Sequence, residues 1–234
     1  ALSAALLLAC GKASEAPAST PATAAAAPAK LTQYTPEQFY ATKSYIGNDI
    51  NATGDAMLVA SDETGVFNLY KVSMDGKSWQ PLTQSTTDAM MPVSWFPQDD
   101  RVLYSADQGG NELHHLYVRE LDGSVKDLTP GDKLKAMFVD WAADGSFYVL
   151  TNERDAKFFD LYKYDGKSYQ RSMVYQNDAG YDIAAVSPDG RYLAAIKART
   201  NADNNVHLID LSAEKPTETL VTPHQGNIAH QVYS

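Results

Sequence analysis

The feature that most constrains the fold of this chain is a motif that recurs every 45 residues. Each copy starts with a turn residue and continues as a short, mostly apolar run, which is typical of a strand covered on both faces. The copies start at positions 55, 100, 145 and 190, and they are Asp55–Asp62, Asp100–Asp107, Gly145–Asn152 and Gly190–Lys197. Repetition at a fixed spacing predicts a chain built from similar supersecondary units.

Three further strand-like series accompany these copies. The third strands are expected at Leu69–Val72, Leu116–Arg119, Leu161–Tyr164 and Leu208–Leu211. The outer strands are expected at Gln80–Thr83, Lys126–Thr129, Ser172–Tyr175 and Thr219–Thr222, and inner strands at Val93–Phe96, Phe138–Trp141 and Ile183–Val186. Asp-Gly pairs at 75–76, 122–123 and 165–166 predict tight hairpins, because glycine tolerates the positive φ that such turns require.

Four antiparallel strands in about 45 residues are the content of a β-propeller blade. A β-sandwich is the alternative, but it gives no reason for self-similarity at this spacing. The last residues, Ile228–Ser234, resemble the inner strand of a fifth blade. We therefore predict an all-β fold in which residues 34–234 form an incomplete β-propeller of four blades and the start of a fifth.

The first ten residues are expected to be the end of a truncated secretory signal. They are apolar and small, and they end in Leu7-Leu8-Ala9-Cys10, which resembles a bacterial lipobox with Cys10 as the lipidated residue. A buried or free cysteine on a short helix is the alternative. Gly11 stands where inner-membrane retention would require Asp. The pattern predicts a periplasmic or outer-membrane-associated lipoprotein.

Residues 11–33 are expected to form a linker. Between Gly11 and Lys30 there are nine Ala, three Pro and four Ser or Thr, with almost no large apolar side chain. Such a composition buries too little surface to offset the entropy of ordering the chain. The segment is therefore predicted to tether a folded body to a membrane.

Composition and motifs exclude several classes of function. Nineteen basic and 29 acidic residues give a formal net charge of −10, which argues against a nucleic-acid partner. One cysteine rules out a disulfide framework within the chain. We expect no cofactor and no metal, because the five histidines match no zinc spacing and no phosphate, dinucleotide or calcium loop is present. The chain also lacks the Gly-x-Ser-x-Gly motif that positions a hydrolase serine.

Several stretches resemble one protein family, and the resemblance covers about residues 37–234. The Ser-Pro-Asp-Gly hairpin in Ser187–Ala194 resembles one common to many bacterial propellers and indicates the fold more than the function. The stretches that resemble the family are Ser61–Tyr70, Tyr104–Leu113, His115–Gly123, Thr151–Asp155 and Phe158–Tyr162. They are similar to the N-terminal propeller of the prolyl oligopeptidase family of serine peptidases, in its bacterial branch of dipeptidyl and acylaminoacyl peptidases. The resemblance implies a C-terminal α/β-hydrolase domain that carries the Ser, Asp and His triad, and this sequence ends before it. No catalytic residue is therefore assigned here, and we expect this chain alone to be inactive.

The resemblance also implies a propeller that admits only short peptides to the hydrolase domain, with specificity supplied by its loops. The loops that join second and third strands are expected at Asp62–Gly65, Asp107–Glu112, Asn152–Asp155 and Arg199–Asp203. The resemblance implies peptide-binding acids and arginines on the face that carries these loops, which makes Glu63, Glu112, Glu153 and Arg154 candidate substrate-facing residues. A carboxylate there could bind a peptide ammonium group, and an arginine could bind a carbonyl or carboxylate. Solvated polar loops are the alternative for each residue. A non-enzymatic binding propeller of the Tol-system or outer-membrane assembly type is the alternative function.

Overall fold

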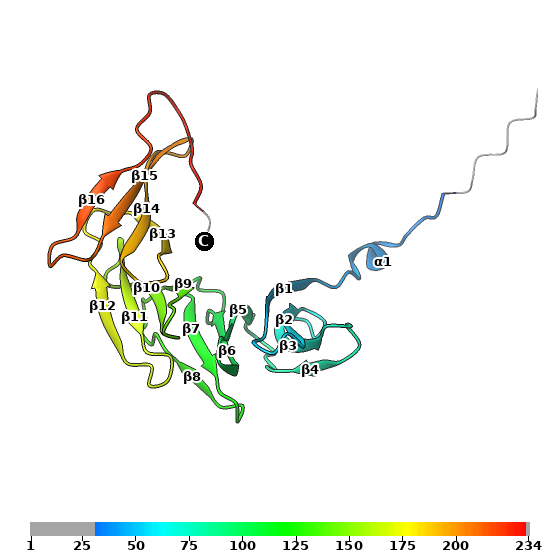
Figure 1. Cartoon of the computed structure of the whole chain (residues 1–234). Coiled ribbons are helices and arrows are strands. Elements are labelled where there is room, and N and C mark those ends of the chain that lie inside the picture. Colours follow the sequence, from blue (N-terminus) through cyan, green and yellow to red (C-terminus); the bar gives the residue numbers. More distant parts are fainter. Residues whose placement is uncertain (1–30, 233–234) are drawn as a thin grey trace, which may run out of the picture. The chain divides into compact units, whose positions relative to one another are not determined.

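The computed structural model describes residues 31–232 and divides the chain into two units, 1–42 and 43–234 (Figure 1). In the first unit, the described residues include one short helix, α1 (Pro36–Tyr40). Thr35 caps it: its hydroxyl oxygen accepts from the Gln38 N–H at 3.2 Å, and the Gln38 side chain accepts from the Thr35 N–H at 3.1 Å. The predicted signal, Cys10 and most of the predicted linker lie outside the described residues.

The second unit contains four antiparallel sheets, each made of four strands that follow one another along the chain. The first is β1 (Tyr45–Ile50), β2 (Ala56–Ser61), β3 (Asn68–Ser73) and β4 (Trp79–Pro81). The second is β5 (Met91–Phe96), β6 (Asp99–Ala106), β7 (His115–Arg119) and β8 (Val125–Asp127). The third is β9 (Ala136–Trp141), β10 (Phe147–Asp155), β11 (Phe158–Tyr164) and β12 (Arg171–Tyr175), and the fourth is β13 (Asp182–Val186), β14 (Tyr192–Thr200), β15 (Asp203–Asp210) and β16 (Thr217–Leu220). The predicted all-β fold of propeller blades is confirmed.

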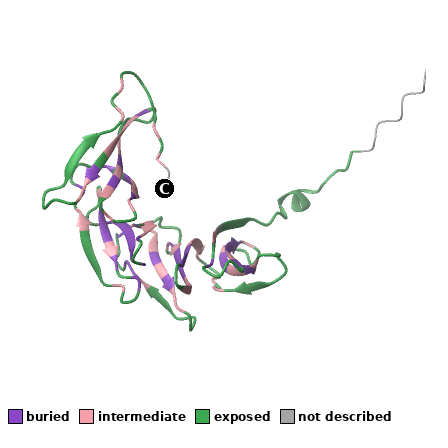
Figure 2. Cartoon of the chain, in the orientation of Figure 1, coloured by how far each residue is buried: buried purple, intermediate pink, exposed green. Residues whose placement is uncertain are grey.

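The core lies between successive blades, where the apolar faces of the middle strands meet. Leu58 and Leu69 of the first blade pack with Val102 of the second. Phe147 and Leu193 belong to the corresponding clusters between the second and third blades and between the third and fourth. The outer strands are largely exposed, as Figure 2 shows in green for β4, β8, β12 and β16. Burial on both faces explains why the second strand of each blade is a nearly continuous apolar run.

The third predicted Asp-Gly hairpin differs from the other two. Gly76 and Gly123 adopt positive φ angles of 72° and 86°, as the turns require, whereas Gly166 does not. A Cβ atom at Gly166 would overlap the carbonyl oxygen of Gly145, so glycine is needed there for close backbone approach. Tyr169 takes the positive φ in this hairpin, at 58°.

Tyr169 is held in that conformation by contacts with the second blade. Its hydroxyl donates to Glu120 Oε1 at 2.6 Å and accepts from Arg101 Nη1 at 2.6 Å. The same guanidinium donates to the carbonyl oxygen of Gly166 at 2.9 Å. A residue that does not usually adopt positive φ is thus fixed by a hydrogen-bond network between blades.

Several expected boundaries are corrected by the structure. The loop expected at 152–155 is strand, because β10 continues to Asp155 and pairs with Phe158. The loop expected at 199–203 shortens to residues 201–202, because Thr200 still pairs with Asp203. The inner strand of the first blade, β1, had not been predicted.

The segment expected to start a fifth blade has no strand over its described part, residues 228–232. Asn204 instead forms hydrogen bonds with the backbone of this segment. The Asn204 N–H donates to the Ile228 carbonyl at 3.0 Å, and the Asn204 side chain bonds both the N–H and the carbonyl of His230. Among residues 31–232, no helix has the length and hydrophobicity needed to cross a lipid bilayer.

Candidate functional site

One end of each blade carries two kinds of connection, and we call this end the inter-blade face. Because consecutive strands run antiparallel, the hairpin between the second and third strands and the link from the outer strand to the next blade leave the sheet at the same end. The hairpins are residues 62–67, 107–114, 156–157 and 201–202. The links are residues 82–90, 128–135, 176–181 and 221–232.

Two of the predicted substrate-facing residues, Glu63 and Glu112, lie on exposed hairpins of this face. The Glu63 backbone is fixed, since its carbonyl accepts from Lys43 Nζ at 2.8 Å. Glu112 has a positive φ of 60°, and its N–H donates to Asp107 Oδ2 at 2.8 Å. Within the described part of the chain, no ion pair neutralises either carboxylate. Both side chains are therefore available to solvent and to a ligand.

Glu153, by contrast, lies on strand β10 and is already engaged. Its Oε2 accepts from Arg171 Nη2 at 2.7 Å. Burial raises the pKa of the Tyr162 hydroxyl, and the hydrogen bond from this hydroxyl to Glu153 raises it further. Glu153 thus connects β10 with β11 and β12.

Arg154 is engaged more completely. Its Nε and Nη2 bind the two carboxylate oxygens of Asp160 at 2.6 and 2.9 Å, and Nη2 lies 3.0 Å from Asp178 Oδ1. The Asp160 side chain is fully buried, and it also accepts from the Asn177 N–H at 2.8 Å. The hydrogen bond to Asp160 is the main reason that the pKa of Arg154 is raised. The arginine fastens the link 176–181 to the third blade.

The four predicted residues do not form one cluster. Glu63 and Glu112 lie on the hairpins of different blades, while Glu153 and Arg154 are neighbours on β10. No hydrogen bond or ion pair between described residues joins Glu63 or Glu112 to the other two. What the inter-blade face offers is a cavity beside each pair of successive blades.

These cavities combine hairpin and link residues. One of about 290 Å³ lies beside the first link and includes Asp88, Tyr104 and Tyr117. One of about 310 Å³ lies beside the second link and includes Glu153 and Arg154, and one of about 180 Å³ lies beside the third. Sequence reasoning placed the links on this face but selected no residue from them, so Asp88 was missed. The repeated register of the blades was the signal that could have identified it.

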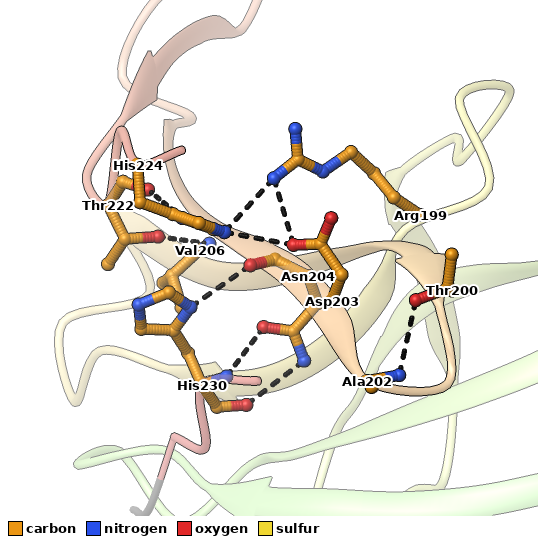
Figure 3. Close-up of polar contacts among 9 residues, drawn as sticks. All are labelled: Arg199, Thr200, Ala202, Asp203, Asn204, Val206, Thr222, His224 and His230. Carbon is orange, nitrogen blue, oxygen red and sulfur yellow. Dashed lines mark hydrogen bonds and ion pairs between the residues drawn. The ribbon is translucent and has the colours of Figure 1, made fainter. Parts of the chain in front are cut away.

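The fourth blade carries an ionic cluster around the buried Asp203 on the same face (Figure 3). Asp203 Oδ1 lies 2.8 Å from Arg199 Nη2 and 2.9 Å from His224 Nε2. His224 Nδ1 also lies 3.0 Å from the carbonyl oxygen of Thr222. The hydrogen bond from His224, aided by that from Arg199, holds the pKa of Asp203 below its usual range. The cluster closes the last link over the β14–β15 hairpin.

Two other histidines take part in local pairs with carboxylates. His115 Nδ1 lies 2.8 Å from Asp127 Oδ2, and His207 Nδ1 lies 2.6 Å from Glu218 Oε1. Over residues 31–232, no group of three or more His, Cys, Asp or Glu side chains is arranged to hold a metal ion.

Comparison with known proteins agrees with this architecture. Residues 81–233 match the family model described as "Prolyl oligopeptidase, N-terminal beta-propeller domain". Dipeptidyl aminopeptidase BIII of Pseudoxanthomonas mexicana is 30% identical over an alignment that covers 89% of this chain and 32% of that protein. The chain thus spans about a third of the length of this curated relative.

Solved structures show the same fold at lower sequence identity. A structure from a study of two prolyl endopeptidases has a TM-score of 0.58 and 15% identity, over 79% of this chain and 30% of that one. TolB from Acinetobacter baumannii has a TM-score of 0.55 and 17% identity, over 79% of this chain and 45% of its own. The family match covers well over half of the sequence. This chain therefore belongs to the family of prolyl oligopeptidase N-terminal β-propeller domains.

Proposed function

We propose that this chain is the substrate-gating propeller of a secreted, lipid-anchored serine peptidase that cleaves short peptides. Its partner would be a C-terminal α/β-hydrolase domain of the same full-length protein. The observation that carries the proposal is the similarity to a dipeptidyl aminopeptidase, of which this chain matches only 32%. In that arrangement the remainder of the protein performs the chemistry, and the propeller controls access to it.

The physical basis for gating is a rigid body with polar loops at one end. The cores between blades fix the sheets, while the hairpins and links of the inter-blade face present Glu63 and Glu112 to solvent. The cavities there, of about 180 to 310 Å³, match single side chains better than a folded substrate. Loops on a rigid scaffold can therefore select short, extended peptides.

The test of the proposal begins with the reading frame that encodes this chain. A Gly-x-Ser-x-Gly motif in the region after Ser234 is expected, because this motif positions the nucleophile of α/β-hydrolases. The protein made from the whole frame should hydrolyse dipeptidyl chromogenic substrates, and alanine in place of the motif serine should abolish the activity. A complete frame without the motif, or a protein without peptidase activity, would contradict the proposal.

A separate measurement tests whether the propeller restricts access to the hydrolase domain. A short peptide should be cleaved, while the same peptide sequence placed within a folded protein should not. A mutant in which two cysteines join the propeller and hydrolase domains should lose activity on oxidation if peptides enter between the domains. Equal cleavage of short peptides and folded proteins would show that the propeller does not restrict access.

A non-enzymatic binding propeller is the second candidate, and the fold shared with TolB favours it. The two candidate functions predict different sequences in the reading frame after Ser234. A stop codon after further blades, together with stable complexes with periplasmic proteins, would support this alternative.

The proposed lipid anchor rests on Leu7-Leu8-Ala9-Cys10 and on the Ala- and Pro-rich segment that follows. Several acyl chains anchor a protein stably, whereas one chain binds only marginally. Cys10→Ser should therefore move the protein, expressed with a complete signal sequence in a bacterium, from the detergent phase to the aqueous phase. Unchanged partitioning, or no incorporation of labelled fatty acid into the parent, would rule out lipidation and the outer-membrane location proposed with it.

A further inference from the structure

The cavity beside the first link has a composition that points to a particular class of ligand. It measures about 290 Å³ and lies between the link 82–90 and the start of the β6–β7 hairpin. We call it the tyrosine pocket. Its lining includes Asp88, Met90, Tyr104, Asp107, Gln108 and Tyr117.

Two stacked tyrosines form one wall of the tyrosine pocket. Tyr104 on β6 and Tyr117 on β7 are direct cross-strand partners, and their rings lie 5.2 Å apart with an angle of 16° between them. Tyr104 is only 4% exposed, and burial raises the pKa of its hydroxyl to about 12. No described residue forms a hydrogen bond with this hydroxyl, whereas Gln108 bonds that of Tyr117. Tyr104 lines the pocket, so its unpartnered hydroxyl can form a hydrogen bond with a polar ligand group there.

Two carboxylates supply negative charge at the same place. Asp88 Oδ1 accepts from the Gly109 N–H at 2.8 Å, and Asp107 Oδ2 accepts from the Glu112 N–H at 2.8 Å. These backbone contacts fix the positions of the carboxylates without neutralising them. Among residues 31–232, neither carboxylate has a Lys, Arg or His nitrogen in ion-pair contact.

The remaining charged groups around the tyrosines leave the balance negative. Arg119 faces Tyr104, but its guanidinium donates to the carbonyl oxygens of Leu82 at 2.7 Å and Glu120 at 3.4 Å. Asp127 faces both tyrosines and is paired with His115. The basic groups nearby are thus already engaged, and the pocket favours a cation.

We propose that the tyrosine pocket binds the side chain of a lysine or arginine residue of a peptide. That the ligand is a peptide rests on the proposed function. The tyrosine rings and Met90 would cover the aliphatic part of that side chain, and Asp88 and Asp107 would bind its charged end. The Tyr104 hydroxyl supplies a further hydrogen bond. The volume accommodates one side chain, so the pocket acts as a specificity subsite.

The experiment uses the purified chain and two probes whose amino and carboxyl ends are blocked and therefore uncharged. They are Nα-acetyl-lysine amide and Nα-acetyl-norleucine amide. Norleucine keeps the four-carbon stem of lysine and lacks the ammonium group. Binding is measured by isothermal titration calorimetry and by saturation-transfer NMR at low ionic strength, where exposed charges are screened least. The lysine probe should bind saturably and the norleucine probe roughly fivefold more weakly or worse, and added salt should weaken only the lysine probe.

The matched variants are Asp88→Asn, Asp107→Asn and, as a control, Asp132→Asn. In Asp88→Asn the new amide side chain keeps an oxygen that can accept from the Gly109 N–H, so the change removes charge and preserves the local fold. Each pocket variant should weaken the lysine probe roughly fivefold, while the change at the exposed Asp132 should have no effect. If Asp88→Asn alters the circular dichroism spectrum, Asp107→Asn decides the result.

Equal binding of the two probes, the absence of saturable lysine binding, or full affinity in a correctly folded pocket variant would overturn the proposal. These measurements do not involve peptidase activity. A pocket that fails to bind lysine therefore leaves the proposed peptidase function standing, and a protein without peptidase activity leaves a cation-binding pocket standing.

Discussion

Trp141 donates its indole N–H to the hydroxyl oxygen of Ser94 over 2.9 Å and thereby joins the inner strands of the second and third blades. The Ser94 hydroxyl in turn lies 2.8 Å from Asp49 Oδ2 on β1, and the same carboxylate oxygen accepts from the Trp95 N–H at 2.9 Å. Three consecutive blades are thus connected by one chain of hydrogen bonds. Ser94 is its central member and is 7% exposed.

Ser94→Ala should lower the free energy of unfolding by roughly 2 kcal/mol, because it leaves the Trp141 N–H and one contact of the Asp49 carboxylate unsatisfied at a partly buried site. The measurement is urea unfolding followed by tryptophan fluorescence and circular dichroism. Ser172→Ala on the exposed strand β12 is the matched control and should be neutral. Equal stability of the two variants would show that the hydrogen-bond chain contributes nothing measurable.

Arg154→Met separates a structural role from a ligand-binding role at this residue. The variant leaves the carboxylate of Asp160 buried without its ionic partner, so the unfolding midpoint should fall by roughly 6 °C at pH 7. The measurement is thermal unfolding followed by circular dichroism. Wild-type stability combined with weakened peptide binding would instead support the role predicted from sequence.

The pH dependence of Arg154→Met follows from the pKa of Asp160. Burial acts to raise this pKa, but the hydrogen bonds from Arg154 and Asn177 outweigh burial and leave it lowered. The contribution of Asp160 to stability is therefore present above the unfolded pKa, near 3.9, and is lost as the pH falls through the folded value. In Arg154→Met burial dominates and raises the pKa of Asp160, so the variant regains stability as the pH falls toward the unfolded pKa. The parent loses its contribution below the unfolded pKa, so the difference between the two should shrink over the whole acid range. A difference that stays constant from pH 7 to pH 3 would contradict this explanation.

The blades were predictable from sequence because the signals that define them are local. An apolar run after a turn residue and an Asp-Gly pair before an outer strand each act within a few residues. The first inner strand was missed because Gly47 and Asp49, which are poor strand formers, interrupt the apolar residues of Tyr45–Ile50. It becomes a strand by pairing with β2, with a register shift between those two residues. Pairing of this kind depends on partners that local patterns do not reveal.

The candidate site was less predictable for the same reason. The sequence identifies Arg154 as a charged residue near a turn, but it does not reveal that Asp160 and Asp178 bind the guanidinium. Likewise, the Asp-Gly pair at Gly166 indicates a turn without showing that its backbone lies against Gly145. Polar residues at blade ends serve to fasten links as well as to face ligands, and only the three-dimensional contacts distinguish the two uses.

Alanine substitution at two glycines should separate backbone strain from close packing. Gly76 and Gly190 have nearly identical φ angles, 72° and 73°. A Cβ atom at Gly76 would meet no atom within 4 Å, whereas one at Gly190 would overlap the hydroxyl of Tyr148, which is 2% exposed and cannot readily move. Gly76→Ala should cost about 1 kcal/mol, and Gly190→Ala roughly 3 kcal/mol. Chemical unfolding of both variants gives the comparison, and equal losses would mean that Tyr148 adjusts freely.

Asp203→Asn should open the last link. The lowered pKa of Asp203 results first from the hydrogen bond with His224 and then from that with Arg199. In the parent, the contribution of this carboxylate to holding the last link closed is therefore present above the unfolded pKa of about 3.9. It is lost as the pH falls through the lower folded value.

Hydrogen exchange of the Asn204 and His230 amides reports whether the link is closed, because the first amide bonds the Ile228 carbonyl and the second bonds the Asn204 side chain. Their protection should fall with acidification in the parent, and in Asp203→Asn it should be low already at pH 7 and nearly independent of pH. The Leu193 amide, in the core of the same blade, serves as an internal reference that should not change. Parent-like protection of Asn204 and His230 in the variant at pH 7 would show that the link is held closed without this ionic cluster.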